Sequence, residues 1–317
     1  MRKEFLKFII TVVLVIAIAG VIDMSAGVIL DNMSSKIATT GDFGKKYHAY
    51  YETTADVVVV GSSRAAHHYN SSIIEDSLHL STFNSGVDGC FFLDNACVIN
   101  SILDRYTPKL IIWEFNPEYL YKHKDIINES FPFYRQIQST TEIIDEFCDF
   151  GTTTLLAISR LYRYNSKVLR ILLRYEGNNK KLDPLKGFEP SSLCTTSLKK
   201  LIQQVNDSLP IDEHRKQLFI RTLERVHDCG CNIVLANSPI YEIPLNINDQ
   251  KATFISLCKD LNVPFFDNTH LSLLEDSKYF HDAIHLNYIG ADIYTNYVIS
   301  QYNKYSTNIR STIKTLN

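Results

Sequence analysis

Apolar and polar residues follow one another along this chain in blocks that predict strands and helices in turn. The clearest block is a run of four valines, and five short stretches in all predict strands, at residues 56–61, 78–84, 110–115, 232–237 and 263–267. Unbroken apolar runs are typical of strands buried on both faces of a parallel sheet. Apolar residues at helical spacing predict helices between the strands, at residues 91–105, 211–229, 249–261 and 287–302. This alternation predicts an α/β fold, a flavodoxin-like three-layer sandwich with about five parallel strands.

The first 30 residues hold the longest apolar run. Residues 8–22 contain one polar side chain, Thr11, and apolar character resumes after Asp23 and continues to Leu30. A membrane-spanning helix needs about 20 mostly apolar residues. Basic residues precede the run, which keeps that flank in the cytoplasm. The sequence therefore predicts a single-pass membrane anchor over residues 1–30, with the rest of the chain extracytoplasmic.

A cleaved signal peptide is the alternative interpretation of the same segment. Ala17-Ile18-Ala19 before Gly20 resembles a small-residue cleavage site. We favour an uncleaved anchor because the hydrophobic character continues beyond this site. Both interpretations predict an exported domain.

The chain after the anchor divides into a stalk and one domain. Residues 31–55 are polar and aromatic and predict a stalk, and residues 56–317 predict the domain. Within it, residues 117–210 break the strand–helix alternation and predict a helical insert that caps the site. A helical stretch at 153–174 carries basic residues three or four apart, which we interpret as a solvated face rather than a lipid- or polymer-binding stripe: Arg160, Arg163, Lys167, Arg170 and Arg174.

Two distant segments carry residues for nucleophilic catalysis. Ser63 follows the valine strand directly, at the carboxyl edge where open α/β sheets keep their active sites. Far along the chain, Asp282 and His285 lie three residues apart. A serine hydroxyl becomes a good nucleophile when an imidazole takes its proton and a carboxylate orients the imidazole. Ser63, His285 and Asp282 are therefore the candidate catalytic triad.

These segments resemble the conserved blocks of the SGNH (GDSL-type) hydrolases, a superfamily of esterases, lipases and carbohydrate O-acyl hydrolases or transferases. Gly61-Ser62-Ser63 matches the block of the nucleophile, and the loop 84–89 matches the glycine block, where we favour Gly89 over Gly86. Asn116 matches the asparagine block after the third strand. The resemblance implies an oxyanion hole formed by the N–H groups of Ser63 and Gly89 and by the Asn116 amide.

Two positions depart from the family pattern. Ser62 replaces the usual aspartate, and Asn116 is followed by Pro117 where the family commonly has Asn-Asp. Similar variants occur in the branch that acylates cell-surface polymers. The resemblance therefore implies a membrane-anchored serine esterase or O-acyltransferase that acts on acyl esters, acetyl above all, of a cell-surface glycan. A transferase would need a multispanning partner that delivers acyl groups across the membrane.

Each of these residues also has a plainer interpretation. Ser63 could cap the helix after it, Asp282 could cap the last helix, and Asn116 before a proline is a natural turn residue. Gly89 could serve only a tight turn. Arg64, His67 and His68 lie near the site in sequence and are not assigned to the catalytic set. If the plainer interpretations hold, the chain is a non-catalytic glycan-binding or scaffold protein on the same fold.

Composition narrows the partners further. A net charge of -3 and a pI near 6.4 give no electrostatic footprint for nucleic acid. No nucleotide-binding glycine motif is present, and no His or Cys spacing predicts a metal site, so we expect neither cofactor nor metal. Because seven is an odd number, at least one cysteine stays free or pairs between chains, and we expect most of the cysteines to be small core residues.

Overall fold

The computed structural model describes residues 2–121, 127–177, 181–194, 198–201, 210–241 and 249–316. Its centre is a sheet of five parallel strands in the order β2-β1-β3-β4-β5. The strands are β1 (Val57–Val60), β2 (Thr82–Asn84), β3 (Leu110–Glu114), β4 (Asn232–Asn237) and β5 (Phe265–Asp267). This is the strand order of flavodoxin-like folds, so the predicted α/β sandwich is confirmed.

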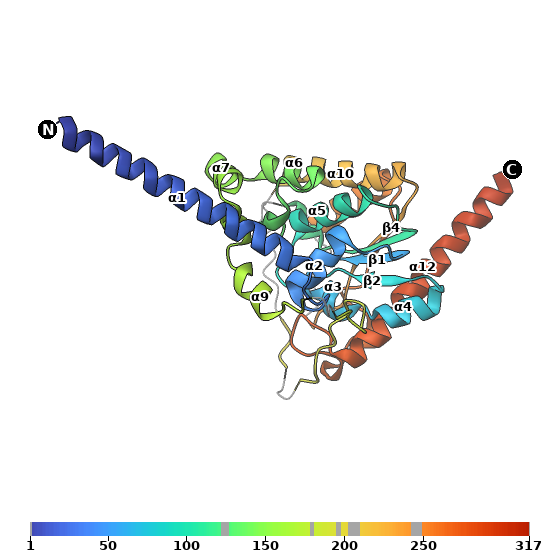
Figure 1. Cartoon of the computed structure of the whole chain (residues 1–317). Helices are drawn as coiled ribbons and strands as arrows, with labels where there is room; N and C mark the ends of the chain where they lie inside the picture. Colours follow the sequence, from blue (N-terminus) through green and yellow to red (C-terminus); the bar gives the residue numbers. More distant parts are fainter. Residues whose placement is uncertain are drawn as a thin grey trace.

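Helices cover both faces of the sheet (Figure 1). One face packs against α5 (Phe92–Leu103), α10 (Glu213–Asp228) and α11 (Asp249–Asp260). The other packs against α3 (Ser63–His68), α4 (Ser71–Leu78) and α12 (Tyr288–Leu316). The four valines of β1 have no exposed surface and belong alternately to the two cores. A strand buried on both sides tolerates an unbroken apolar run, which explains the pattern in the sequence.

Several predicted elements have different ends. The second strand is shorter than predicted, because Leu78 ends α4 and His79 turns the chain with a left-handed φ of 54°. The helical stretch at 153–174 is divided at Ser159 and at Asn165. It forms three short helices, α7 (Phe150–Ile158), α8 (Arg160–Tyr164) and α9 (Lys167–Leu173).

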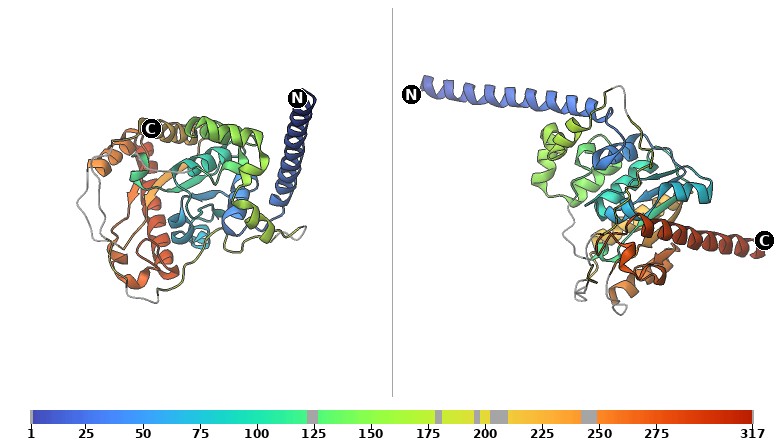
Figure 2. Two further views of the ribbon diagram at one scale, coloured as in Figure 1. Left: turned by 90° about the vertical axis from the view of Figure 1, so that its left-hand side faces the viewer. Right: turned by 90° about the horizontal axis from the view of Figure 1, so that it is seen from below.

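The predicted stalk at 31–55 is wrong. Helix α1 (Arg2–Ser34) extends past the expected anchor, and α2 (Gly41–Tyr51) follows it as part of the domain. Tyr50 is fully buried and stacks on Phe133 with ring centroids 3.8 Å apart. The polar residues of α2 concealed this, since Lys45 and Lys46 are buried too. α1 and the last turns of α12 project from opposite sides of the domain (Figure 1 and Figure 2).

In the described part of the insert, helices α6 (Gln138–Phe147), α7, α8 and α9 pack on α5, on α1 and on one another, and the predicted helical cap over the site is not seen among these residues. Besides these helices, the insert contains two short 3-10 helices, η1 (Pro117–Leu120) and η2 (Phe131–Phe133). α6 packs on α5, and α8 and α9 pack on α1. The extended part of the insert reaches the site instead, because Glu189 donates its N–H to the Ala66 carbonyl. Other parts of the insert, 122–126, 178–180, 195–197 and 202–209, lie outside the described residues.

Candidate active site

Ser63 lies where strand β1 turns into helix α3. Gly61 links them and has no room for a side chain, because a Cβ there would lie 2.7 Å from the Ala65 Cβ and 2.8 Å from the Glu114 Cβ. Ser62 occupies the N-cap position without a side-chain cap bond, and Ser63 is the first helical residue. Ser63 is therefore not the cap of α3, and its hydroxyl has another partner.

That partner is His285. The Nε2 atom of His285 lies 2.8 Å from the Ser63 Oγ, and its Nδ1 lies 2.8 Å from Oδ2 of Asp282. A carboxylate only accepts hydrogen bonds, so Asp282 holds a proton on Nδ1 and leaves Nε2 as an acceptor for the serine hydroxyl. The three predicted triad residues thus form one continuous hydrogen-bonded chain.

Asp282 is fixed by its own loop as well as by the imidazole. Its Oδ1 accepts from the N–H groups of Ile284 and His285, at 2.8 and 2.9 Å. Burial favours the neutral acid, but these hydrogen bonds and the imidazole outweigh it and hold the pKa of Asp282 below its usual value. Asp282 does not cap α12, because the side-chain oxygen of Asn287 does so, 3.1 Å from two N–H groups of the first turn.

A second chain of hydrogen bonds fixes the loop that carries His285. The N–H of Leu286 donates to Nε2 of His68 at 2.9 Å, and His68 Nδ1 lies 2.7 Å from the Ser238 Oγ. Ser238 Oγ lies 3.0 Å from a carboxylate oxygen of Glu114. Because Nε2 accepts a bond, His68 is neutral and donates from Nδ1. Burial, and then the charge of Arg64, hold the pKa of His68 well below its usual value.

Glu114 ends this chain as a buried carboxylate with several partners. Its side chain is 1% exposed and pairs with the Arg64 guanidinium at 3.2 Å. It also accepts hydrogen bonds from the Tyr69 hydroxyl and from the Ser238 N–H. A buried charge is tolerated when it is paired and its lone pairs are used. Residues from β3, α3 and the end of β4 are thereby locked together beneath the triad.

A third histidine lies beside the triad. His67 donates from Nδ1 to the Glu189 carbonyl at 2.6 Å, and its Nε2 lies 3.3 Å from a carboxylate oxygen of Asp88. Its ring centre lies 5.5 Å from that of His285. Burial opposes a charge on His67, but the bonds to Asp88 and Glu189 outweigh it and raise the pKa of His67. A histidine with a raised pKa therefore lies beside the triad histidine.

The two candidate glycines differ in the space around them. The Gly86 N–H already donates to the Asn84 side chain at 2.9 Å, and a Cβ on Gly86 would lie 2.5 Å from the Ala66 nitrogen. Gly89 lies next to Asp88 in an exposed turn with a φ of +73°, and open space surrounds it. Gly86 is thus needed for packing, and Gly89 is the glycine with space around it for a ligand.

Asn116 leaves β3 beside Ser63. Val60 pairs with Trp113, and Ser63 and Asn116 each follow three residues later, at the same edge of the sheet. The Asn116 side-chain oxygen caps η1 by accepting from the Glu118 N–H at 3.1 Å, and its Nδ2 lies 3.5 Å from the Glu118 carboxylate. The capping role of Asn116 is therefore seen directly, and among the described residues its amide nitrogen makes this one long contact.

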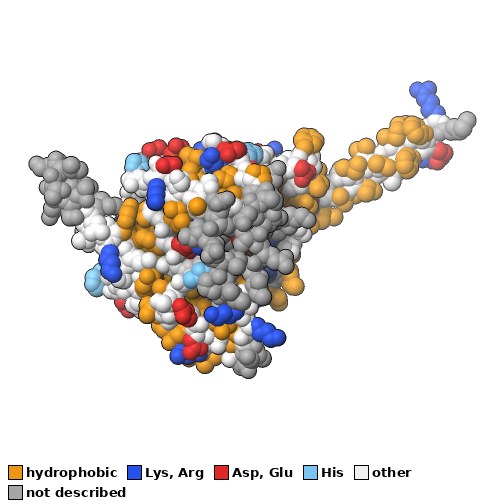
Figure 3. Space-filling model, turned by 180° about the vertical axis from the view of Figure 1, so that it is seen from behind, with side chains coloured by type: hydrophobic (Ala, Val, Ile, Leu, Met, Phe, Trp, Pro, Cys, Tyr) orange, Lys and Arg blue, Asp and Glu red, His pale blue; other side chains and the backbone are white. Residues whose placement is uncertain are grey.

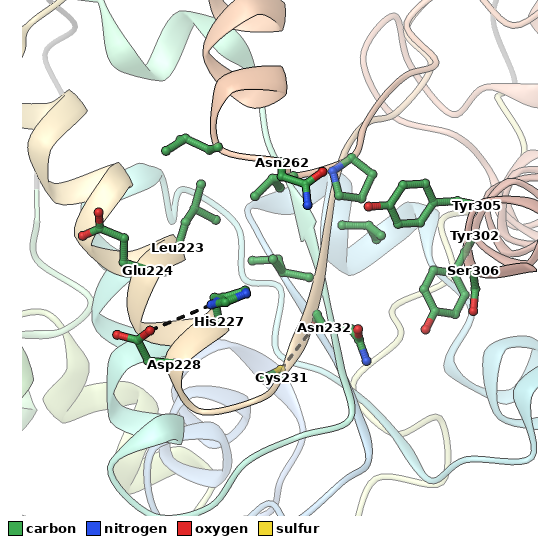
Figure 4. A pocket seen from close by; sticks show the side chains of 15 residues that line it. Leu223, Glu224, His227, Asp228, Cys231, Asn232, Asn262, Tyr302, Tyr305 and Ser306 are labelled. Carbon is green, nitrogen blue, oxygen red and sulfur yellow. Dashed lines mark hydrogen bonds and ion pairs between the residues drawn. The ribbon is translucent and has the colours of Figure 1, made fainter. Parts of the chain in front are cut away.

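Other parts of the described chain offer less for chemistry. A groove lies at the amino ends of β4 and β5, the edge opposite the triad, between α10 and the Tyr302 and Tyr305 side chains of α12 (Figure 4). Across the described residues, no three His, Cys, Asp or Glu side chains gather as metal ligands. Four of the seven cysteines are buried, as expected for small core residues.

The sequence matches no protein-family model, and it matches no curated protein. The site must therefore be interpreted from its own geometry. Sequence reasoning missed Glu114, Ser238 and Glu189 around it. An acid inside the apolar stretch 110–115 was the available signal for Glu114, because a buried carboxylate requires partners. Ser238 and Glu189 had no local signal, since their partners lie more than a hundred residues away.

Proposed function

We propose that this chain is a serine esterase or O-acyltransferase of the SGNH type. The observation that carries the proposal is the hydrogen-bonded chain from Asp282 through His285 to Ser63, with 2.8 Å at both joints. Nucleophile, base and orienting carboxylate in this geometry are the parts that acyl transfer requires. They lie at the carboxyl edge of a parallel sheet, where α/β enzymes bind substrates.

The reaction has two half-reactions. The Ser63 Oγ bonds to the ester carbonyl carbon while His285 takes the hydroxyl proton, and Asp282 stabilises the imidazolium. The bond to the alcohol then breaks, and His285 protonates the departing oxygen, which leaves an acyl group on Ser63. Water or a sugar hydroxyl then attacks the acyl carbon and gives its proton to His285. The bond from the acyl carbon to the Ser63 Oγ breaks, His285 returns the proton to Oγ, and the acid or the new ester leaves. Water makes the enzyme an esterase, and a sugar hydroxyl makes it a transferase.

Three donors are proposed for the oxyanion that forms in each half-reaction. They are the N–H groups of Ser63 and Gly89 and the side-chain amide of Asn116. Such donors stabilise the charge that develops in the transition state, and the loss of one typically lowers turnover about a hundred- to a thousandfold. The open turn at Gly89 and the exit of Asn116 beside Ser63 support this set.

The proposed substrate is an acyl ester, acetyl above all, of a cell-surface glycan. This rests on the family resemblance and on α1, which is long and apolar enough to span a membrane. Basic residues before the apolar run favour a domain outside the cytoplasm. For transfer, a multispanning partner would supply acyl groups. Without catalysis, the chain would be a glycan-binding or scaffold protein on the same fold.

Labelling with a fluorophosphonate probe tests whether Ser63 is activated. We expect one adduct on the full chain in detergent, read by intact mass, and none on Ser63→Ala. Ser62→Ala is the matched control, because Ser62 is the neighbouring serine and makes no side-chain cap bond. It should label like the wild type. If the well-folded wild type carried no adduct, or if Ser63→Ala kept it, catalysis by this serine would be excluded and the binding or scaffold function favoured.

A further inference from the structure

Each of the five basic residues of the insert helices bonds to another part of the protein, so they do not form a freely solvated face, although Arg170 and Arg174 keep exposed surface. Arg160 pairs with Asp31 of α1 at 3.3 Å, and Arg170 pairs with Asp42 of α2 at 2.7 Å. Lys167 is buried. Its ammonium group lies 2.7 Å from the Glu129 carboxylate. The other two also bond inward, Arg163 to the carbonyls of Leu156 and Tyr134 and Arg174 to the Thr40 hydroxyl.

The outward side of the same helices is apolar. On α9, Lys167 is buried while Leu169, Leu172 and Leu173 are 63%, 53% and 76% exposed. On α7, three more apolar side chains are exposed. We call these six residues the apolar outer face: Phe150, Leu155, Ile158, Leu169, Leu172 and Leu173. A helix in water normally buries leucine and exposes lysine, so this inverted arrangement indicates an apolar environment outside.

The position of the apolar outer face relative to a membrane follows from its contacts with helix α1. Residues 5–22 are exposed and almost wholly apolar, and at 1.5 Å per residue they measure about 27 Å, close to the thickness of a bilayer core. Asp23 follows at the boundary. Its carboxylate accepts from the Arg160 N–H at 2.7 Å and from the Ser159 hydroxyl at 2.5 Å. The junction of α7 and α8 is therefore fixed at the depth where the apolar run of α1 meets its first acid.

The exposed side of α1 stays apolar beyond Asp23. Met24, Val28 and Ile29 are each more than half exposed, and this side reaches the level where Ile171 of α9 packs against Leu30. α7 and α9 flank α1 where it leaves the domain (Figure 1), and hydrophobic side chains cover its projecting part (Figure 3). The apolar surface therefore continues without a break along α1, from its projecting part to the level of α7 and α9.

We propose that the apolar outer face lies in the interfacial layer of the bilayer that α1 spans. Apolar side chains of α7 and α9 enter the boundary between headgroups and acyl chains, as in interfacial helices. Arg160 and Arg170, about half exposed and paired on their inner side, lie at headgroup level. The domain is thus held flat against the membrane rather than suspended from it. This inference rests on α1 spanning the bilayer and not on the proposed catalysis.

Tryptophan quenching by brominated lipid tests the contact. The chain has one tryptophan, and Trp113 is fully buried, so its emission is a constant background. Ile158→Trp and Leu172→Trp each place an indole on the apolar outer face. Val15→Trp places one in the middle of the span, and Leu273→Trp places one at a site 54% exposed on η3 (Ser272–Leu274). Each full-length variant is reconstituted into phosphatidylcholine vesicles brominated near the headgroup end or deep in the acyl chain.

We expect Ile158→Trp and Leu172→Trp to lose emission with bromine near the headgroup end, and Val15→Trp to lose it with deep bromine. Leu273→Trp should lose none. If Val15→Trp were quenched while both face variants behaved like Leu273→Trp, the membrane contact would be refuted. Blue-shifted but unquenched emission from the face variants would refute it as well, because a protein partner or second copy would then cover them. An unquenched Val15→Trp would remove the spanning helix on which the proposal rests.

Discussion

Asn116 has one observed role, as a helix cap, and one proposed role, as an oxyanion donor, and the two can be separated by mutation. Its side-chain oxygen caps η1, while the proposed oxyanion contact uses its side-chain nitrogen. Alanine removes both groups. Serine is a good N-cap, but its shorter hydroxyl cannot replace the reach of the amide nitrogen.

We expect Asn116→Ala to lower kcat about a hundredfold or more, the cost of one oxyanion donor, and Asn116→Ser to remain equally low. Both are measured with a chromogenic acetyl ester. If serine restored kcat to the wild-type value, Asn116 would act only as a cap. Thermal unfolding gives the complementary readout, because loss of the cap alone should cost about 1 kcal/mol in the alanine variant.

At the scale of elements, the loop from β5 to α12 depends on helix α3 for its position. His68 of α3 accepts the Leu286 N–H, one residue after the triad histidine. His68→Asn keeps a donor toward Ser238 but removes the acceptor for Leu286, whereas the longer His68→Gln places an amide oxygen near the position of Nε2. We expect His68→Asn to lose roughly 1–3 kcal/mol of stability, the cost of an unsatisfied buried donor, and to lower kcat.

His68→Gln should restore most of both losses if the hydrogen bond to the loop is what matters. The KM for the acetyl ester should change little in either variant, because His68 lies behind the triad and is fully buried. If His68→Asn lost stability but kept the wild-type kcat, the loop would hold His285 in place without the bond from the Leu286 N–H to His68.

The same histidine gives a pH dependence of stability with a defined sign. The pKa of His68 is well below its usual value in the folded chain, so only the unfolded chain takes up this proton as pH falls below about 6.5. Stability should therefore fall as pH falls from 6.5 toward the folded pKa, by up to about 1.4 kcal/mol per pH unit. Chemical unfolding at pH 7.5 and 5.5 should show a smaller difference for His68→Gln than for wild type. An equal difference would mean that other groups cause it.

The elements also show what the sequence could predict. Valine runs and strand–helix alternation are local signals, and they predicted all five strands and that the strands run parallel. Ser63, Asp282 and His285 were found because they lie at the ends of such elements. Helix α2 and the Glu114–Ser238–His68 chain were missed, since burial of Lys45, Glu114 and His68 depends on distant partners. Periodicity cannot reveal a polar residue that is buried because another segment pairs with it.

For the whole molecule, α2 connects the long apolar helix α1 to the candidate site. Lys45 is buried, and its ammonium group lies 3.2 Å from the Glu189 carboxylate. The Glu189 backbone in turn contacts Ala66 and His67 of α3. The segment after α1 is therefore part of the domain, and the orientation of the site relative to α1 is set by packing.

Phe43 provides a test of this integration. It is 2% exposed and packs against Phe133 and Tyr164, with ring centroids 6.3 and 6.2 Å away. Phe43→Ala should lower the free energy of unfolding of the detergent-solubilised full chain by about 3–5 kcal/mol, as large-to-small core substitutions do. Leu273→Ala, at a site 54% exposed, is the control and should change it by less than about 0.5 kcal/mol.

A flexible tether and an integrated helix predict different results for these two variants. On a tether, Phe43 would be solvated in the folded and unfolded chains alike, and its removal would cost no more than that of Leu273. In the packed arrangement its removal opens a cavity between α2, η2 and α8, the elements that join α1 to the sheet. The packing between α1 and the domain should then loosen as well, so Phe43→Ala should also increase proteolysis between α1 and α2. If the two variants were equally stable, the result would instead support a flexible tether after α1, and the site would then be free to move relative to α1.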